Sequence, residues 1–165
     1  MAGARRPSAA ARRAPPTSTT VSSAAAGVAD ELLAVARDRA RTNRFWQHLG
    51  IDVAEVREGW ARLRVDVRDE LRNAPGAPVH GGVYAALVDA AIGCALATVN
   101  PESGGGVGQT TLDLNVSYLA AARGATIFAE GTLLRRGRTV AFGEVRVTDD
   151  AGALIAVGRA TYLIR

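Results

Sequence analysis

The sequence predicts an α+β fold in which a curved antiparallel sheet surrounds one long, buried helix. Two observations carry this prediction. Residues 80–99 are apolar on nearly every helical face, which is typical of a helix buried all round. Six other segments read as strands, several with strictly alternating apolar and polar side chains that indicate one buried and one wet face. A doubly wound α/β fold would need more helices, alternating with the strands.

The first 27 residues are expected to form a disordered tail rich in Ala and Arg, ahead of a single domain of residues 28–165. All 20 basic residues are arginine, and four of them lie in this tail, which has no acid. The net charge of +4 therefore lies in the tail, and the domain is neutral. This distribution does not predict nucleic-acid binding. A functionless leader and a targeting peptide both remain open for the tail.

The expected elements follow in order from there. A short helix over 30–41 and a packing segment ending at Gly50 precede two strands, 51–57 and 61–68, with a turn at 58–59. Loop 69–78 leads into the buried helix. The glycine-rich loop 100–108 follows it and lacks the Gly-Lys-Ser/Thr ending of a phosphate loop. Four strands close the chain: 110–118, 126–135, 139–148 and 153–164.

Turn residues at 136–137 and 149–152 predict antiparallel hairpins among the last strands. On strand 110–118 an apolar set alternates with a polar set, so we expect one buried and one wet face. The apolar set is Leu112, Leu114 and Val116, and the polar set is Asp113, Asn115 and Ser117.

The composition also excludes several classes of protein. Cys94 is the only cysteine, so no intrachain disulfide can form, and we expect a reducing, cytoplasmic location. The longest apolar segment carries Asp89 in its middle, so no membrane helix is predicted. His48 and His80 are the only histidines and lie far apart in the chain, so we expect no metal site and no cofactor. A Ser-His-Asp triad is not expected either, because no Gly-x-Ser-x-Gly elbow is present.

Asp89 is the strongest candidate for a functional residue. It is the only charged residue between His80 and Val99, where an unpaired charge is costly to bury. Aspartate is also a poor helix former in mid-helix. Buried carboxylates often mark functional sites, so we interpret Asp89 as catalytic. The structural alternative is an aspartate bonded to a neighbouring strand or facing solvent at a gap in the sheet.

The second signal is His80-Gly81-Gly82 at the start of the same helix. The first N–H groups of a helix have no internal acceptor, and glycine lets a ligand approach the backbone closely. This arrangement suits a developing oxyanion, although Gly-Gly could also serve only as a tight helix entry. Gly81 and Asp89 lie eight residues apart, about 12 Å along one helix. If both act on one carbonyl, they must come from two copies related by a two-fold axis.

These residues resemble a known family. Asn73, Gly76, His80-Gly81-Gly82, Leu87 and Asp89 resemble the Asn…Gly…His-Gly-Gly…Leu-x-Asp signature of hotdog-fold thioesterases, in the PaaI-like branch of the phenylacetic acid pathway. Segments 111–119, 136–142 and 154–161 resemble its later strands, so the resemblance covers about residues 45–164. One departure is a gap between Gly76 and His80 that is one residue longer than usual, which affects the placing of Asn73.

The resemblance implies a role for each position. The aspartate at Asp89 is the general base or nucleophile, and Gly81 supplies the oxyanion N–H. Asn73 helps to place the attacking water or the carboxylate, His80 orients the loop, and Thr111 helps to hold the water. The substrate or its CoA moiety is expected at Gly82, Gly137, Arg138 and Thr139.

The predicted function is hydrolysis of an aryl- or medium-chain acyl-CoA by a homodimer with shared active sites, which pairs into a dimer of dimers. The first alternative is a non-catalytic acyl-CoA binding or sensing module on the same fold. A carboxylate in the helix argues against it, because an apolar pocket gains nothing from a buried charge. A hotdog enoyl-CoA hydratase is the second alternative. It would need an Asp and a His within one short loop, which the sequence lacks.

Overall fold

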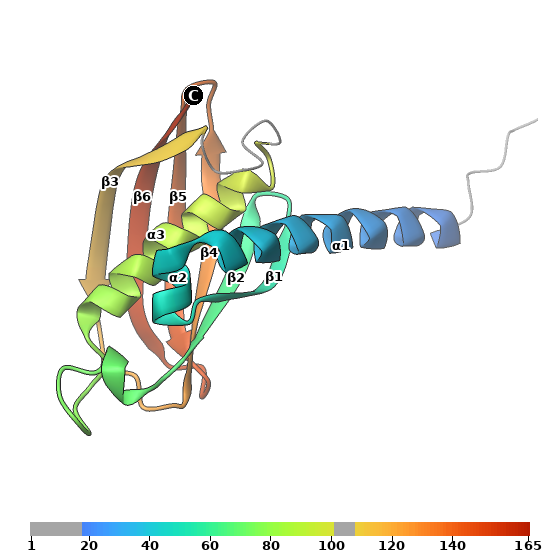
Figure 1. Ribbon diagram of the computed structural model, residues 1–165. Coiled ribbons are helices and arrows are strands. Elements are labelled where there is room, and N and C mark those ends of the chain that lie inside the picture. Colours follow the sequence, from blue (N-terminus) through green and yellow to red (C-terminus); the bar gives the residue numbers. More distant parts are fainter. Residues whose placement is uncertain (1–17, 101–107) are drawn as a thin grey trace, which may run out of the picture.

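The computed structural model describes residues 18–100 and 108–165, and it confirms the predicted α+β architecture. Six antiparallel strands form one sheet in the order β1-β2-β4-β5-β6-β3, and it curves around the helix α3, Gly81–Ala97 (Figure 1). The strands are β1 Asp52–Arg57, β2 Trp60–Asp66, β3 Gln109–Tyr118, β4 Thr126–Arg136, β5 Val140–Asp149 and β6 Leu154–Ile164. Each bound lies within two residues of its prediction.

The helix α3 is buried as the apolar pattern predicted. Eleven of its 17 residues are buried, and the fully covered side chains of Leu87, Val88 and Ile92 lie against the sheet. The helix packs closely against the sheet because some of the strand residues are small. A Cβ on Gly131 of β4 would lie 2.7 Å from the carbonyl carbon of Ala91, closer than real Cβ contacts. The sheet therefore approaches the helix backbone directly, which brings strand side chains within reach of Asp89.

The N-terminal helix is longer than expected. The helix α1 spans Ser18–Thr42, so residues 18–27, predicted as part of a disordered tail, are helical. Alanine has the highest helix propensity, and the run Ala24-Ala25-Ala26 favours a helix without any apolar periodicity. The helix extends away from the sheet at its N-terminal end (Figure 1). The rest of the predicted tail, 1–17, lies outside the described residues, as do 101–107 of the predicted glycine-rich loop.

Two shorter helices complete the described chain. The helix α2, Arg44–Leu49, begins at Asn43, whose side chain accepts from the Trp46 N–H, and ends at Gly50 in the left-handed conformation. The 3-10 helix η1, Asp69–Leu71, lies in the loop between β2 and α3. Within residues 18–100 and 108–165, none of the helices combines the length and the apolar composition of a membrane-spanning segment.

The strand β3 differs from its prediction in burial. It is an edge strand, and its apolar side chains Leu112 and Leu114 are 58% and 39% exposed rather than buried. The register shifts between Thr111 and Asp113, where a bulge interrupts the pairing with β6. Alternation along a sequence predicts two distinct faces, but it cannot tell what covers the apolar one. Among residues 18–100 and 108–165 of one chain, nothing covers these leucines.

Candidate functional site

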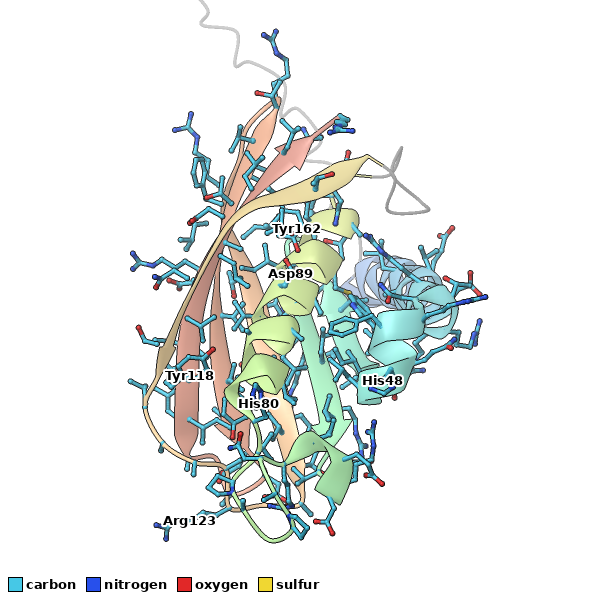
Figure 2. The ribbon with its side chains drawn as sticks, turned by 60° about the vertical axis from the view of Figure 1, so that its left-hand side comes forward. His48, His80, Asp89, Tyr118, Arg123 and Tyr162 are labelled. Atoms are coloured by element: carbon cyan, nitrogen blue, oxygen red, sulfur yellow. The ribbon has the colours of Figure 1, made fainter. Side chains whose placement is uncertain are left out.

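The carboxylate of Asp89 lies in the middle of α3 and faces β3 and β6. Its Oδ1 accepts two hydrogen bonds, one from the Thr111 hydroxyl at 2.7 Å and one from the Tyr162 hydroxyl at 2.7 Å. Figure 2 shows Asp89 and Tyr162 side by side between the helix and the sheet. In the described part of the chain, Oδ2 accepts no hydrogen bond, and the residue is half-buried. One oxygen is therefore anchored, and the other is available to a ligand.

Asp89 bonds to neighbouring strands, as the purely structural interpretation of this residue predicts. A purely structural carboxylate would gain from partners on both oxygens, because an unsatisfied buried acceptor is costly. Asp89 instead keeps Oδ2 free of protein donors in the described residues. This arrangement suits a base or nucleophile that needs one oxygen for chemistry.

The N–H groups at the start of α3 differ in whether they have an acceptor within the described protein. His80 is the N-cap, and its Nδ1 accepts from the Gly82 N–H at 2.9 Å. The N–H of Val83 donates to the His80 carbonyl. Among the described residues no acceptor receives the N–H of Gly81. One donor at the positive end of the helix dipole is thus left for a ligand, whereas Gly82 has none to offer.

The aromatic ring of Tyr118 lies beside Gly81. A Cβ on Gly81 would lie 3.1 Å from Cε1 of Tyr118, so glycine leaves just enough room for the ring. Tyr118 is 56% exposed, at the end of the edge strand β3. Figure 2 shows His80 at the N-terminal end of α3 and Asp89 farther along it. Within one chain the predicted site residues therefore form two groups rather than one.

Asn73 belongs to the group at the start of α3. Its side-chain amide donates to the carbonyl of Pro78 at 3.2 Å, and its backbone N–H donates to the same oxygen. These bonds close the loop 73–78 that leads into His80. The amide makes no bond to Asp89 of its own chain, so any contact with a carboxylate would have to be with another copy.

The predicted CoA-binding residues Gly137, Arg138 and Thr139 form the turn between β4 and β5. Arg138 and Thr139 are exposed, and the Gly137 N–H closes the turn by donating to the Val140 carbonyl. The Thr139 carbonyl accepts from Ile164, two residues beyond Tyr162 on β6. The turn therefore lies at the end of the sheet that carries the Asp89 group, away from His80.

Tyr162 is the member of the Asp89 group that the sequence did not reveal. It sits on a strand in an ordinary apolar pattern, and only its pairing with Thr111 across β3 and β6 brings it to the carboxylate. Among the described residues, no group of three or more His, Cys, Asp or Glu side chains is placed to hold a metal ion.

Comparison with known proteins now gives the family. The model of the thioesterase superfamily matches residues 78–156, which include the start of α3, Asp89 and Thr111. A protein of Halobacterium salinarum that carries a provisional esterase name is 34% identical over 144 residues, covering 82% of this chain and 94% of that protein. The medium/long-chain acyl-CoA thioesterase YigI of Salmonella typhimurium is 28% identical over 131 residues, covering 73% of this chain and 84% of that protein.

Solved structures agree with this result. The crystal structure of a thioesterase-superfamily protein superposes with a TM-score of 0.74 at 36% identity, covering 82% of this chain and 99% of that one. The Escherichia coli PaaI protein of the phenylacetic acid degradation operon shares the fold, with a TM-score of 0.68 at 19% identity over 81% of this chain and 96% of its own. The chain belongs to the thioesterase superfamily and has the hotdog fold, which supports a thioesterase-type hydrolase function.

Proposed function

We propose that this protein hydrolyses acyl-CoA thioesters, with Asp89 as the general base or nucleophile. The observation that carries this proposal is that the two oxygens of its carboxylate have different surroundings. Two hydroxyls hold Oδ1, and Oδ2 is left without a protein donor in the described residues. A carboxylate held in this way can take a proton from water, or attack a carbonyl itself, without first breaking its own hydrogen bonds.

In the proposed reaction, water adds to the thioester carbonyl while Asp89 removes its proton. The Gly81 N–H stabilises the oxyanion that forms, since it has no other acceptor among the described residues. Collapse breaks the C–S bond, releases the free acid and returns the proton to the CoA thiolate. In the direct variant Oδ2 attacks the carbonyl, and the C–S bond breaks as CoA leaves as its thiolate. Water then hydrolyses the anhydride to the free acid, and the proton left on Asp89 goes to the thiolate. Neither route requires a metal or redox cofactor.

The proposed reaction needs two copies of the chain for each site. Gly81 and Asp89 lie about 12 Å apart along one helix, too far to act on the same carbonyl. An antiparallel meeting of two β3 edges would bring the Asp89 end of one helix toward the Gly81 end of the other. The exposed leucines of β3 support this arrangement, because pairing would cover them. We propose a homodimer with two shared sites, which pairs further into a dimer of dimers.

The proposed substrate is an aryl- or medium-chain acyl-CoA. The similarity to YigI, a medium/long-chain acyl-CoA thioesterase, supports an acyl-CoA substrate. The turn of Gly137, Arg138 and Thr139 is proposed to bind the CoA moiety, and exposed Arg138 offers a cation to a phosphate. Asn73 and His80 are proposed to hold the loop that precedes Gly81, so that the Gly81 N–H faces the oxyanion.

The first test measures thiol release from a panel of acyl-CoAs by wild type and Asp89→Asn. Loss of a general base lowers turnover by about 10²–10⁴-fold, and we expect CoA binding to persist. Wild-type protein that binds acyl-CoA but turns over none of the panel would favour the non-catalytic sensing module instead.

A second pair of variants isolates the Gly81 N–H. Gly81 is the first helical residue, a position that proline favours, and His80 has φ −63° and ψ 133°, which proline accepts in the residue before it. Gly81→Pro thus removes the N–H with the helix start kept. Gly81→Ala is the matched control, because it adds the same Cβ beside Tyr118 and keeps the N–H. We expect kcat to fall about 10²-fold more in the proline variant than in the alanine variant.

A further inference from the structure

We propose that Tyr162 is a positioning residue for Asp89, and that its hydroxyl holds the carboxylate in the orientation that leaves Oδ2 free for the reaction. This inference rests on the proposed function. The Tyr162 hydroxyl lies 2.7 Å from Oδ1 of Asp89 and 2.7 Å from the main-chain carbonyl oxygen of the same residue. The single O–H of Tyr162 is thus shared between a side-chain oxygen and the main-chain oxygen of Asp89.

This shared hydrogen bond limits how the carboxylate can rotate. Thr111 also donates to Oδ1, and it is the direct cross-strand partner of Tyr162 in the register of β3 and β6. Two donors on neighbouring strands therefore converge on one oxygen of Asp89 from the sheet side. With Oδ1 occupied twice, turning the carboxylate plane away from this orientation would break both bonds. Tyr162 and Thr111 together hold the plane of the carboxylate, so that its second oxygen points toward the substrate.

Burial keeps the phenol in its donor form. Tyr162 is 5% exposed. Burial, and to a smaller extent repulsion from the Asp89 carboxylate, raises the pKa of its hydroxyl well above the ordinary range. The group cannot act as an acid or base near neutral pH, so it does not take part in proton transfer. Its role toward Asp89 is that of a fixed hydrogen-bond donor.

A glycine in α3 leaves space for this hydroxyl. Gly93 lies one turn after Asp89, and a Cβ there would be 3.0 Å from the Tyr162 hydroxyl oxygen. Glycine is unfavourable in mid-helix relative to alanine, so its presence here fits a requirement for close approach. On the same turn, Gln109 of β3 donates from Nε2 to the Gly93 carbonyl at 2.7 Å. Strand side chains thus hold the backbone of residues 89–93 at two points.

The test compares Tyr162→Phe with wild type and with Tyr84→Phe. The phenylalanine keeps the ring and removes only the hydroxyl. Tyr84 is the matched control, because it is also a buried phenol, with its oxygen bonded to the Ala122 N–H rather than to Asp89. We expect Tyr162→Phe to lower kcat about tenfold or more at nearly unchanged KM. Tyr84→Phe is expected to keep kcat within about twofold of wild type.

Gly93→Ala provides a second route to the same contact. Its Cβ pushes the Tyr162 hydroxyl away from Asp89 without removing it, so we expect a smaller loss of kcat in the same direction. In the Tyr162→Phe background the Cβ has no hydroxyl to displace, and the glycine change should have almost no further effect on kcat. A tyrosine that served packing alone would give two independent losses.

The outcomes separate this proposal from the proposed function. If wild type is active, Asp89→Asn is not, and Tyr162→Phe keeps wild-type kcat, the positioning role is overturned and the thioesterase proposal stands. Multiplicative losses in Tyr162→Phe and Gly93→Ala would also overturn it. If wild type hydrolyses no acyl-CoA, the proposed function fails, and the role of Tyr162 in it fails with it.

Discussion

Arg37 of α1 donates from Nε to the carbonyl oxygen of Val53 on β1, 3.2 Å away. The sheet has two edges, β1 and β3, and this bond uses a backbone acceptor on the first. The helix α1 also packs along β1, so that edge is covered. The edge at β3 has no such cover in the described residues and carries exposed apolar side chains, Leu112 and Leu114 among them.

This asymmetry predicts that copies of the chain associate through β3. The double variant Leu112→Arg/Leu114→Arg would place like charges close together across a two-fold edge pairing, which destabilises it. We expect it to shift the mass measured by light scattering from an oligomer toward the monomer and to lose most thioesterase activity. Phe45→Arg is the control, because Phe45 is 60% exposed on α2 and far from β3 in the chain. An unchanged mass for the β3 variant would rule out this edge as the dimer interface.

A shared active site predicts that two inactive variants restore each other. In a mixed dimer of Asp89→Asn and Gly81→Pro, one site receives both changes and the other receives neither. After random exchange of equal amounts, half of the dimers are mixed and each has one intact site, so activity should return to about a quarter of wild type. The measurement is thiol release before and after subunit exchange in mild denaturant.

The control for this experiment is each variant carried through the same exchange alone. Neither should gain activity. If the mixture stays inactive while native mass spectrometry shows mixed dimers, Asp89 and Gly81 do not act on one substrate from two chains. The proposal of a shared site would then be wrong, whatever the oligomeric state.

Much of this architecture could be predicted because its signals are local. The burial of α3 follows from its uniform apolar composition, and Asp89 stands out as a lone charge in it. Tyr162 could not be found in this way. Its approach to Asp89 depends on the register of β3 against β6 and on the space left at Gly93, and neither is encoded near residue 162.

Two other features escaped prediction for different physical reasons. The start of α1 at Ser18 was missed because alanine promotes a helix through propensity, without the apolar stripe used to recognise one. The exposure of Leu112 was missed because alternation reports which side chains share a face. What covers that face depends on neighbouring elements or other copies of the chain.

The cap formed by His80 gives a prediction about stability. Its Nδ1 accepts from the Gly82 N–H, so His80→Ala leaves this donor without a partner at the start of α3. Loss of an N-cap costs about 1 kcal/mol, which should lower the midpoint of thermal unfolding. His80→Asn is the matched variant, because asparagine is among the best N-cap residues and should keep most of the stability. Equal losses in the two variants would show that the cap is not what His80 contributes.

Alkaline pH should destabilise the fold through two buried groups that keep their protons to higher pH in the folded state than in the unfolded state. Burial raises the pKa of the Cys94 thiol from 9.0 to about 12, and burial also raises that of the Tyr162 phenol above its ordinary 10.0. A raised pKa in the folded state stabilises the fold below the unfolded value, and this contribution is lost as pH rises through the folded one. The free energy of unfolding should therefore begin to fall near pH 9 from Cys94 and near pH 10 from Tyr162.

Denaturant unfolding at several values between about pH 8 and 11 measures this effect. Each group contributes a slope of up to about 1.4 kcal/mol per pH unit. Cys94→Ala should be less stable than wild type at neutral pH because it removes a buried sulfur, yet its stability should decline less steeply above pH 9. Tyr162→Phe should show the same reduced slope, with its onset one unit higher, near pH 10. Parallel curves for wild type and both variants would mean that these groups are accessible to solvent in the folded protein and not held by the core.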